Sequence, residues 1–283
     1  MQSAAELLQQ ISLEKIEENI FRGQSHSIGG RRVFGGQVLA QSLQAAMLTA
    51  PNDRLVHSMH GYFVLAGDTE RPIIYDVDRV RDGGSFTTRR VRAIQHGQPI
   101  FTMAASFQKM EQGNDHQIEM PKVPPPEEVL SDQELAKKLD DKLPAGIKNW
   151  LFFPRPIEFR PVEGPTMLDR RTHEPFHHVW FRAKGELGND PRNHQVVLAY
   201  ASDYNLLSTA LKPHSHIITE LMMASLDHAM WFHRSFRADD WLLYALDSPS
   251  ASNARGFTRG NVFDRSGKLV ASVVQEGLIR IRK

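Results

Sequence analysis

The stretch DGGSFTTRRVRAIQHGQPIFTMAASFQ, residues 82–108, decides the fold class of this chain. It holds two segments rich in β-branched and aromatic residues, about 85–95 and 99–109, and similar segments precede it at about 55–65 and 72–81. Turn signals at Asp82-Gly83-Gly84 and His96-Gly97 separate the last three segments. Short turns between such segments are typical of hairpins, so the four segments predict an antiparallel meander.

A second copy of this pattern follows about 170 residues later, a period that suggests a duplicated domain and not a solenoid. Ser85-Phe86-Thr87 matches Gly256-Phe257-Thr258, and Gly61-Tyr62-Phe63 matches Met230-Trp231-Phe232. At 283 residues the chain lies near the size at which single hydrophobic cores stop growing. Two fused units are therefore expected.

Each unit also contains one predicted helix. In the first unit, Leu39, Leu43 and Ala46 recur at helical spacing after Val33-Phe34-Gly35-Gly36-Gln37. One helix followed by a curled meander is the hot-dog arrangement. The predicted fold class is α+β, a double hot-dog of two fused helix-plus-antiparallel-sheet units.

In the second unit, Asp190-Pro191 is typical of a helix start. Apolar residues continue at spacings of three and four, so this helix is predicted to run to about Leu211 and to contain Asp203. The predicted domains are an N-terminal unit at 1–112, a linker at 113–150 and a C-terminal unit at 151–283. A short surface helix is predicted within the linker from Ser131 to Asp141.

Composition excludes several classes of function. The chain has 34 basic and 33 acidic residues, so its net charge of +1 gives no reason to expect a nucleic-acid partner. It contains no cysteine, which removes disulfides, thiolate zinc sites and a cysteine nucleophile. No apolar run approaches the roughly 20 residues of a membrane span, and the first residues do not resemble a signal peptide. We expect a cytoplasmic protein without a cofactor.

Three polar residues distinguish the second copy from the first. In the register of the repeat, Asp203, Ser225 and Gln275 replace Gly36, Val56 and Ala105. A carboxylate between the apolar positions Tyr200 and Tyr204 would be costly unless it is hydrogen-bonded or functional. These three coincident replacements make Asp203, Ser225 and Gln275 the candidate catalytic residues.

The strand predicted at about 224–233 alternates between two faces. Strict alternation puts Ser225 on one face with Asp227, and His228 on the other. Several arginines flank the two matching hairpins. Any single one of them fits a solvated strand face, but together they could meet phosphate groups of a ligand, and Arg89 and Arg255 are the candidates for that contact.

The segment His173-Glu174-Pro175-Phe176-His177 matches the His-Glu-x-x-His zinc motif by letter. That motif requires a helix, which brings both histidines to one face. Pro175 opposes a helix, and residues 178–181 continue as a strand pattern, so no metal site is predicted. A Gly-x-Ser-x-Gly serine-hydrolase elbow is also absent from the sequence.

At these residues the sequence resembles the acyl-CoA thioesterase II family of double hot-dog enzymes. The resemblance extends over essentially the whole chain and is carried by blocks that include residues 33–37, 55–58, 200–203, 227–234, 250–252, 254–257 and 274–277. It implies hydrolysis of acyl-CoA to fatty acid and coenzyme A, with the family's catalytic aspartate, hydroxyl residue and glutamine at Asp203, Ser225 and Gln275. The hydroxyl residue is commonly threonine in that family, whereas Ser225 lacks the methyl group that restricts the rotamer.

These residue types suit direct attack by water. Asp203 would accept a proton from a water held by Ser225 and Gln275, and no covalent acyl-enzyme is required. The backbone amides around Gly35, Gly36 and Gln37, at a helix start, would polarise the thioester carbonyl. A homo-oligomer, dimer or tetramer, is expected because open sheet edges tend to pair with other subunits.

Two other functions fit a hot-dog chain. A dehydratase acting on hydroxyacyl thioesters would need a histidine paired with a carboxylate, and Asp227-His228 is the neighbouring pair in the predicted core. Alternation separates those two side chains. An acyl-CoA-binding protein would keep the scaffold without chemistry, which the three polar replacements oppose.

Overall fold

One antiparallel sheet runs through the molecule. The computed structural model describes residues 2–30, 32–138, 152–164, 171–216 and 218–282. Its 13-stranded sheet has the order β1-β2-β4-β5-β6-β3-β10-β13-β12-β11-β8-β7, with β9 also paired to β13. The first half supplies β1 (Glu14–Glu17), β2 (Ile20–Gly23), β3 (Leu55–Phe63), β4 (Ile73–Asp82), β5 (Phe86–Gln95) and β6 (Gln98–Gln108). The meander predicted in the first half is confirmed.

The second half repeats this arrangement. It supplies β7 (Ile157–Pro161), β8 (Phe176–Ala183), β9 (Leu221–Ser225), β10 (Asp227–Phe232), β11 (Leu242–Ser252), β12 (Arg255–Asp264) and β13 (Leu269–Ile281). The halves join where β3 pairs with β10 and Met59 lies opposite Met230. Corresponding strands thus meet at the centre of one continuous sheet, which is the predicted double hot-dog.

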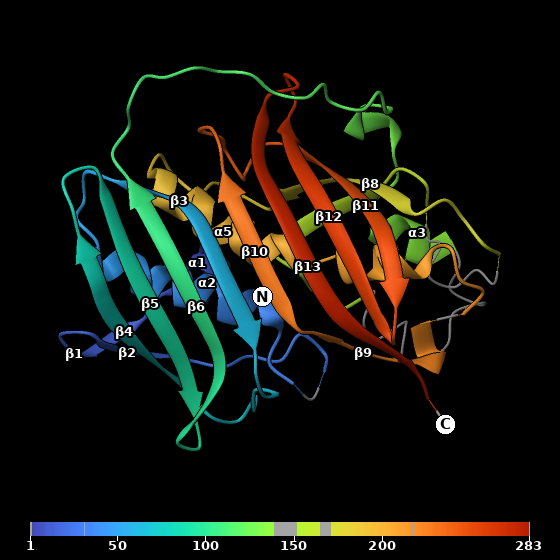
Figure 1. Ribbon diagram of the computed structural model, residues 1–283. Helices are drawn as coiled ribbons and strands as arrows, with labels where there is room; N and C mark the ends of the chain where they lie inside the picture. The colour runs from blue at the N-terminus through green and yellow to red at the C-terminus, as the bar shows by residue number, and fades with distance from the viewer. Residues whose placement is uncertain (1, 31, 139–151, 165–170, 217, 283) are drawn as a thin grey trace.

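The long helix of each half packs on one face of the sheet. Figure 1 shows α1 (Ala4–Ile11), α2 (Gly35–Thr49) and α5 (Pro191–Ser202) behind the strands. Side chains such as Leu39 and Leu43 on α2 are fully buried, and burying each contributes about 1.5–3 kcal/mol. This burial explains why helices with few charged residues form here.

Helices α2 and α5 lie antiparallel to each other. Arg192, at the start of α5, donates hydrogen bonds to Asn52 and to the Pro51 carbonyl just beyond the end of α2. At the opposite end, the Gly36 N–H of α2 donates to Asp203 just beyond α5. The start of one helix therefore meets the end of the other.

The prediction that α5 continues to about Leu211 was wrong. The helix ends at Ser202, Asp203 is its C-cap, and Asn205 has a positive φ of 64°. A residue in the left-handed conformation ends an α-helix and changes the direction of the chain. The 3₁₀ helix η4 (Leu207–Leu211) follows. The apolar spacing continues because Tyr204 and Leu207 are still buried, although the backbone has left the α-helix.

The segment between the halves crosses toward the second half without regular structure until η1 (Pro126–Glu128) and α3 (Asp132–Lys138). The Trp180 indole N–H donates to the Pro124 carbonyl at 2.8 Å, which holds this segment against the sheet. The predicted linker helix is present over Asp132–Lys138, and positions 139–141 lie outside the described residues.

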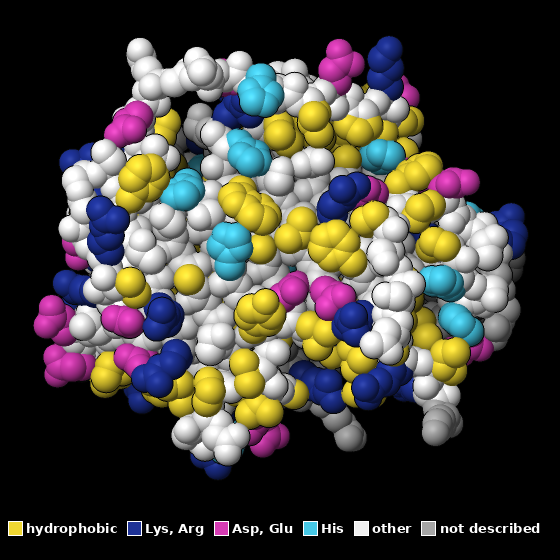
Figure 2. Space-filling model, in the orientation of Figure 1, with side chains coloured by type: hydrophobic (Ala, Val, Ile, Leu, Met, Phe, Trp, Pro, Cys, Tyr) yellow, Lys and Arg dark blue, Asp and Glu magenta, His cyan; other side chains and the backbone are white. Residues whose placement is uncertain are grey.

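The sheet face turned away from the helices is exposed. Figure 2 shows basic and acidic side chains side by side on this face, with histidine and hydrophobic side chains among them. Several of the charges form cross-strand pairs, such as Arg92 with Asp76 and Arg259 with Asp247. No helix in the described residues is long and apolar enough to cross a membrane.

Candidate active site

Asp203 lies where the two halves meet. Its carboxylate accepts the Gln275 Nε2–H at 2.9 Å, and it also accepts hydrogen bonds from the Gly36 backbone N–H and the Ser225 hydroxyl. These donors come from β13, from the start of α2 and from the end of β9. The structure thus brings together the three residues singled out in the sequence.

The internal register was wrong for Gly36. Gly36 lies at the start of α2, whereas Asp203 follows the end of α5, so the two are not equivalent positions. They are instead neighbours in space, because the helices are antiparallel. The first half therefore contributes part of the site formed around the second half's carboxylate.

Glycine is required at the α2 start. A Cβ added at Gly35 would lie 2.6 Å from the Asp203 Oδ2, and one added at Gly36 would lie 2.3 Å from the Tyr200 carbonyl oxygen. Both distances are far below a van der Waals contact. The two glycines allow the α2 backbone to approach the carboxylate closely.

A β-bulge turns Ser225 into the site. Ser225 pairs with Gly277 and Ala229 pairs with Val274, so the segment from Ser225 to Ala229 is one residue longer than its partner. Leu226 lies between β9 and β10 and donates its N–H to the Glu276 carbonyl. The extra residue inverts the side-chain alternation beyond it.

The expectation that His228 points away from Ser225 was therefore wrong. His228 is fully buried, and its Nδ1 lies 3.3 Å from the Gln275 Nε2. Asp227 points elsewhere and accepts the Glu276 N–H at 2.7 Å. Sequence reasoning considered His228 only as part of a dehydratase pair and did not place it beside Gln275. The match of Gly61 with Met230, extended back by two residues, aligns His228 with the apolar Met59.

Burial sets the charge state of these groups. Desolvation raises the pKa of Asp203 above its ordinary value, opposed by the hydrogen bonds from Gln275, Gly36 and Ser225. Burial lowers the pKa of His228 to about 3, so this ring is neutral at physiological pH. Asp203 is thus a more basic carboxylate than a surface aspartate, and His228 is a poor proton acceptor.

An apolar cavity of about 280 Å³ opens beside the carboxylate. Gly35 and Ser225 are among its lining residues, together with side chains such as Phe63, Met223 and Leu226. Arg32, which is exposed, also lines it. An apolar pocket meeting a few polar groups at one end is typical of a small-molecule site.

Gln37 and Arg89 are occupied by other contacts. The Gln37 carboxamide binds Gln10 and the Gln24 carbonyl, and its backbone N–H bonds to Phe34. Arg89 is buried and makes five hydrogen bonds, including those to Thr49 and Asp82. Its guanidinium N–H groups are all bonded within the first half. The geometry therefore gives Arg89 a role in stabilising that half and not in contacting a ligand.

Arg255 lies at the surface and pairs with Glu276, with its Nε 2.9 Å from the carboxylate. Glu276 follows Gln275 on β13, so the pair lies on the opposite face of that strand. Contact between Arg255 and a ligand phosphate would take place at the start of β12, an inner strand of the sheet.

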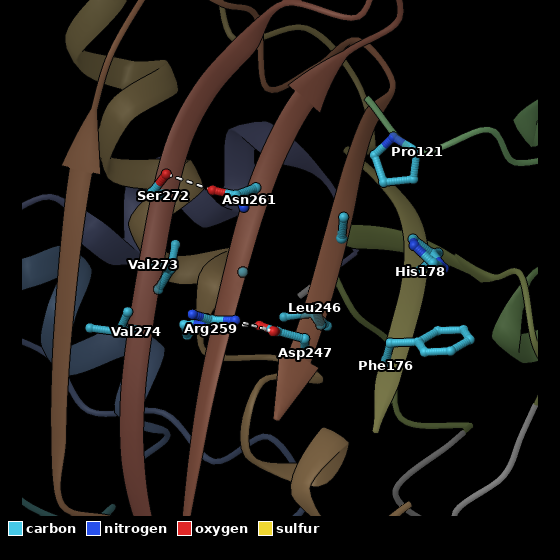
Figure 3. A pocket seen from close by; sticks show the side chains of 12 residues that line it. Pro121, Phe176, His178, Leu246, Asp247, Arg259, Asn261, Ser272, Val273 and Val274 are labelled. Carbon is cyan, nitrogen blue, oxygen red and sulfur yellow. Dashed lines mark hydrogen bonds and ion pairs between the residues drawn. The ribbon is translucent and has the colours of Figure 1, made fainter. Parts of the chain in front are cut away.

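A further hollow, of about 540 Å³, lies on the outer face of the second half (Figure 3). Pro121 and His178 line one side of it, and the Arg259–Asp247 and Ser272–Asn261 pairs form part of its floor. It contains none of the three candidate catalytic residues. In the part of the chain that the structure describes, no group of three or more His, Cys, Asp or Glu residues could hold a metal.

Both halves of the chain match family models. Residues 155–278 match the acyl-CoA thioesterase family model, and residues 22–108 match the model of the acyl-CoA thioesterase N-terminal domain. Acyl-coenzyme A thioesterase 8 of Homo sapiens is 41% identical over 96% of this chain and 88% of its own length. Acyl-CoA thioesterase 2 of Haemophilus influenzae is 41% identical over 97% of this chain and 96% of its own length.

Solved structures of related proteins have the same fold as this chain. The acyl-CoA thioesterase II TesB2 of Mycobacterium marinum superposes with a TM-score of 0.81 at 41% identity, covering 98% of this chain and 99% of that one. A hot-dog protein of Alicyclobacillus acidocaldarius has a TM-score of 0.78 at 18% identity over 98% of this chain and 99% of its own, and shares the fold. With both halves matched by family models and relatives aligned along nearly its full length, the chain belongs to the acyl-CoA thioesterase family.

Proposed function

We propose that this protein hydrolyses acyl-CoA thioesters to free acid and coenzyme A by direct attack of a water activated by Asp203. The observation that supports the proposal most is the environment of the Asp203 carboxylate. Asp203 is bonded to Gln275, Ser225 and the Gly36 N–H beside an apolar cavity. Family membership supports the substrate class.

In the proposed reaction, the water oxygen attacks the thioester carbonyl carbon while Asp203 takes one of its protons. Gln275 Oε1 has no hydrogen-bond partner among the described residues, so it could accept the second hydrogen of that water. Because neighbouring atoms cover this oxygen, the water would reach it only when side chains beside the cavity move. The Ser225 hydroxyl also donates a hydrogen bond to the Asp203 carboxylate and helps to fix its position.

The tetrahedral intermediate then collapses and the carbon–sulfur bond breaks. A thiol has a pKa of about 8.5, so the departing thiolate needs no strong general acid. The Gly36 and Gln37 amides are already bonded to Asp203 and to the Phe34 carbonyl. Polarisation of the thioester carbonyl is therefore assigned to the Gly35 amide, at the positive end of α2.

The acyl chain would enter the cavity lined by Phe63, Met223 and Leu226. Arg255 stays the proposed contact for the phosphate groups of coenzyme A. Catalysis without a cofactor, a homo-oligomeric state and a cytoplasmic location also remain predictions.

Asp203→Asn tests the base role. We expect kcat for thiol release to fall by about 10²–10⁴-fold with little change in KM, because the variant keeps the side-chain shape but cannot accept the proton. Asp227→Asn is the matched control, since the neighbouring carboxylate faces Glu276. Turnover of Asp203→Asn near the wild-type rate would remove Asp203 from the mechanism.

The pH dependence of kcat/KM has an expected direction. Asp203 must be ionised to act, so kcat/KM should fall as the pH drops through its raised pKa. The acid limb should lie above the ordinary range for aspartate. An acid limb at or below that range would contradict the assignment.

Single turnover in ¹⁸O-labelled water separates direct attack from an acyl-enzyme. We expect one labelled oxygen in the acid product and none in the protein. Trapped acyl-protein would overturn the direct route. A dehydratase would form an enoyl thioester without releasing thiol, and a binding protein would retain acyl-CoA intact.

A further inference from the structure

His228 joins Asp203 and Gln275 to the backbone of α5. Its Nδ1 lies 3.3 Å from the Gln275 Nε2, and its Nε2 lies 3.0 Å from the Ser202 Oγ. The Ser202 hydroxyl in turn donates to the Ala199 carbonyl at 2.9 Å. Ser202, His228 and Gln275 are fully buried, and Asp203 is partly buried.

The direction of each hydrogen bond in this chain follows from its chemistry. The Gln275 Nε2 can only donate, so the His228 Nδ1 accepts. A neutral imidazole then carries its hydrogen on Nε2 and donates it to Ser202, whose own hydrogen is used on Ala199. The backbone of a helix thereby sets the tautomer of a buried ring.

The ring tautomer in turn sets the orientation of the Gln275 amide. Its two N–H groups point to Asp203 and to His228. A reversed amide would set Oε1 against the carboxylate and the lone pair of Nδ1, which is repulsive. The orientation present leaves Oε1 as the buried acceptor without a partner among the described residues.

We propose that His228, backed by Ser202, is a positioning residue that holds the Gln275 amide in its catalytic orientation. This rests on the proposed function only in taking Gln275 as part of the machinery. His228 itself is not a proton carrier. The first half holds Met59 at the corresponding strand position, opposite Ala105, just as the second half aligns His228 with Gln275.

His228→Met is the matched substitution, because it installs the residue of the other half. Methionine is similar in size to histidine, but its sulfur is only a weak acceptor for the hydrogen bond from Gln275. We expect kcat to fall by about 10- to 100-fold, as for other residues that orient a reacting group, with KM little changed. The acid limb of kcat/KM should move to higher pH, because the Gln275 hydrogen bond lowers the pKa of Asp203. Three tyrosines that interact electrostatically with Asp203 have raised pKa values and stay neutral in this range: Tyr200, Tyr204 and Tyr244.

A conservative variant separates positioning from folding. His228→Asn places an amide oxygen near the Nδ1 position, so it should recover much of the kcat loss and return the acid limb toward the wild type. A merely structural His228 would lower the active fraction of both variants and leave the acid limb in place, and that result would overturn the proposal.

Nitrogen-15 NMR of the imidazole gives a test that does not depend on turnover. We expect the Nε2–H tautomer of His228 in the wild type, and loss of that preference in Ser202→Ala. An Nδ1–H tautomer in the wild type would overturn the proposal. If Asp203→Asn keeps full turnover while His228 shows the expected tautomer, the hydrolytic mechanism fails and the positioning chain stands.

Discussion

The two halves carry the same bulge with different side chains around it. In the first half, Val56 pairs with Phe107 and Ser58 with Ser106, which leaves one extra residue in β3. The second half has its extra residue between Ser225 and Ala229. Side chains at corresponding positions are Val56 and Ser225, Met59 and His228, and Ala105 and Gln275. The backbone device was duplicated, but polar groups occupy it in only one copy.

The helix ends differ in the same sense. In the second half Asp203 is the C-cap of α5, whereas in the first half α2 ends at Thr49, which accepts hydrogen bonds from the buried Arg89. Arg89 pairs with Ala105 on the neighbouring strand, as Thr258 pairs with Gln275. By strand pairing, the counterpart of Thr258 is Arg89 and not Thr87, with which the sequence repeat matched it. A guanidinium thus occupies the first half where the second half has a small hydroxyl. One half holds the reacting groups, and the other supplies the start of α2.

The largest effect is expected from converting the second half into the first. Ser225→Val with Gln275→Ala removes two donors that hold Asp203, and kcat should fall by about 10²–10⁴-fold. Thiol release measures it, with circular dichroism to confirm folding. The reciprocal pair Val56→Ser with Ala105→Gln should create no second site, because the carboxylate is missing there. Substantial turnover in the first double variant would show that Ser225 and Gln275 are not what makes the second half catalytic.

Arg89→Met tests the structural difference. Five hydrogen bonds are lost in a buried setting, so the free energy of unfolding should fall by about 2–4 kcal/mol. KM for acyl-CoA should not change. The control is Arg90→Met, since Arg90 is exposed and only loosely paired with Asp78. A raised KM with unchanged stability would return Arg89 to the coenzyme A site.

Gly35→Ala tests how much the first half contributes to the second half's site. Alanine favours a helix, but its Cβ would press on the Asp203 carboxylate, so kcat should fall by about 10- to 100-fold. The matched control is Gly84→Ala, where an added Cβ meets nothing within 4 Å. Equal kinetics for the two variants would mean that Asp203 does not depend on the α2 start.

Local patterns predicted most of the scaffold. The four strands of the first meander lie within a residue or two of their predicted ranges, because alternation and turn residues are short-range signals. The N-terminal elements α1, β1 and β2 were not predicted. The end of α5 was misplaced because Tyr204 and Leu207 remain buried beyond the last helical turn.

The candidate site was predicted in part. Asp203, Ser225 and Gln275 were found because each differs from its supposed counterpart in the first half. The strand pairing confirms that Val56 and Ala105 are the counterparts of Ser225 and Gln275. For Asp203 the counterpart was wrong, since Gly36 touches it and does not correspond to it. His228 was placed on the wrong face because a bulge adds one residue and leaves no mark in the pattern of side chains.

By itself, the sequence determined that the chain is a duplicated helix-and-meander unit and that its second copy holds the polar residues, because periodicity and composition are properties of the linear chain. The tertiary structure alone decided which groups meet. Antiparallel helices bring Gly36 to Asp203, and a one-residue bulge turns Ser225 and His228 to the same face. Both outcomes depend on contacts between residues far apart in the chain, which no local pattern encodes.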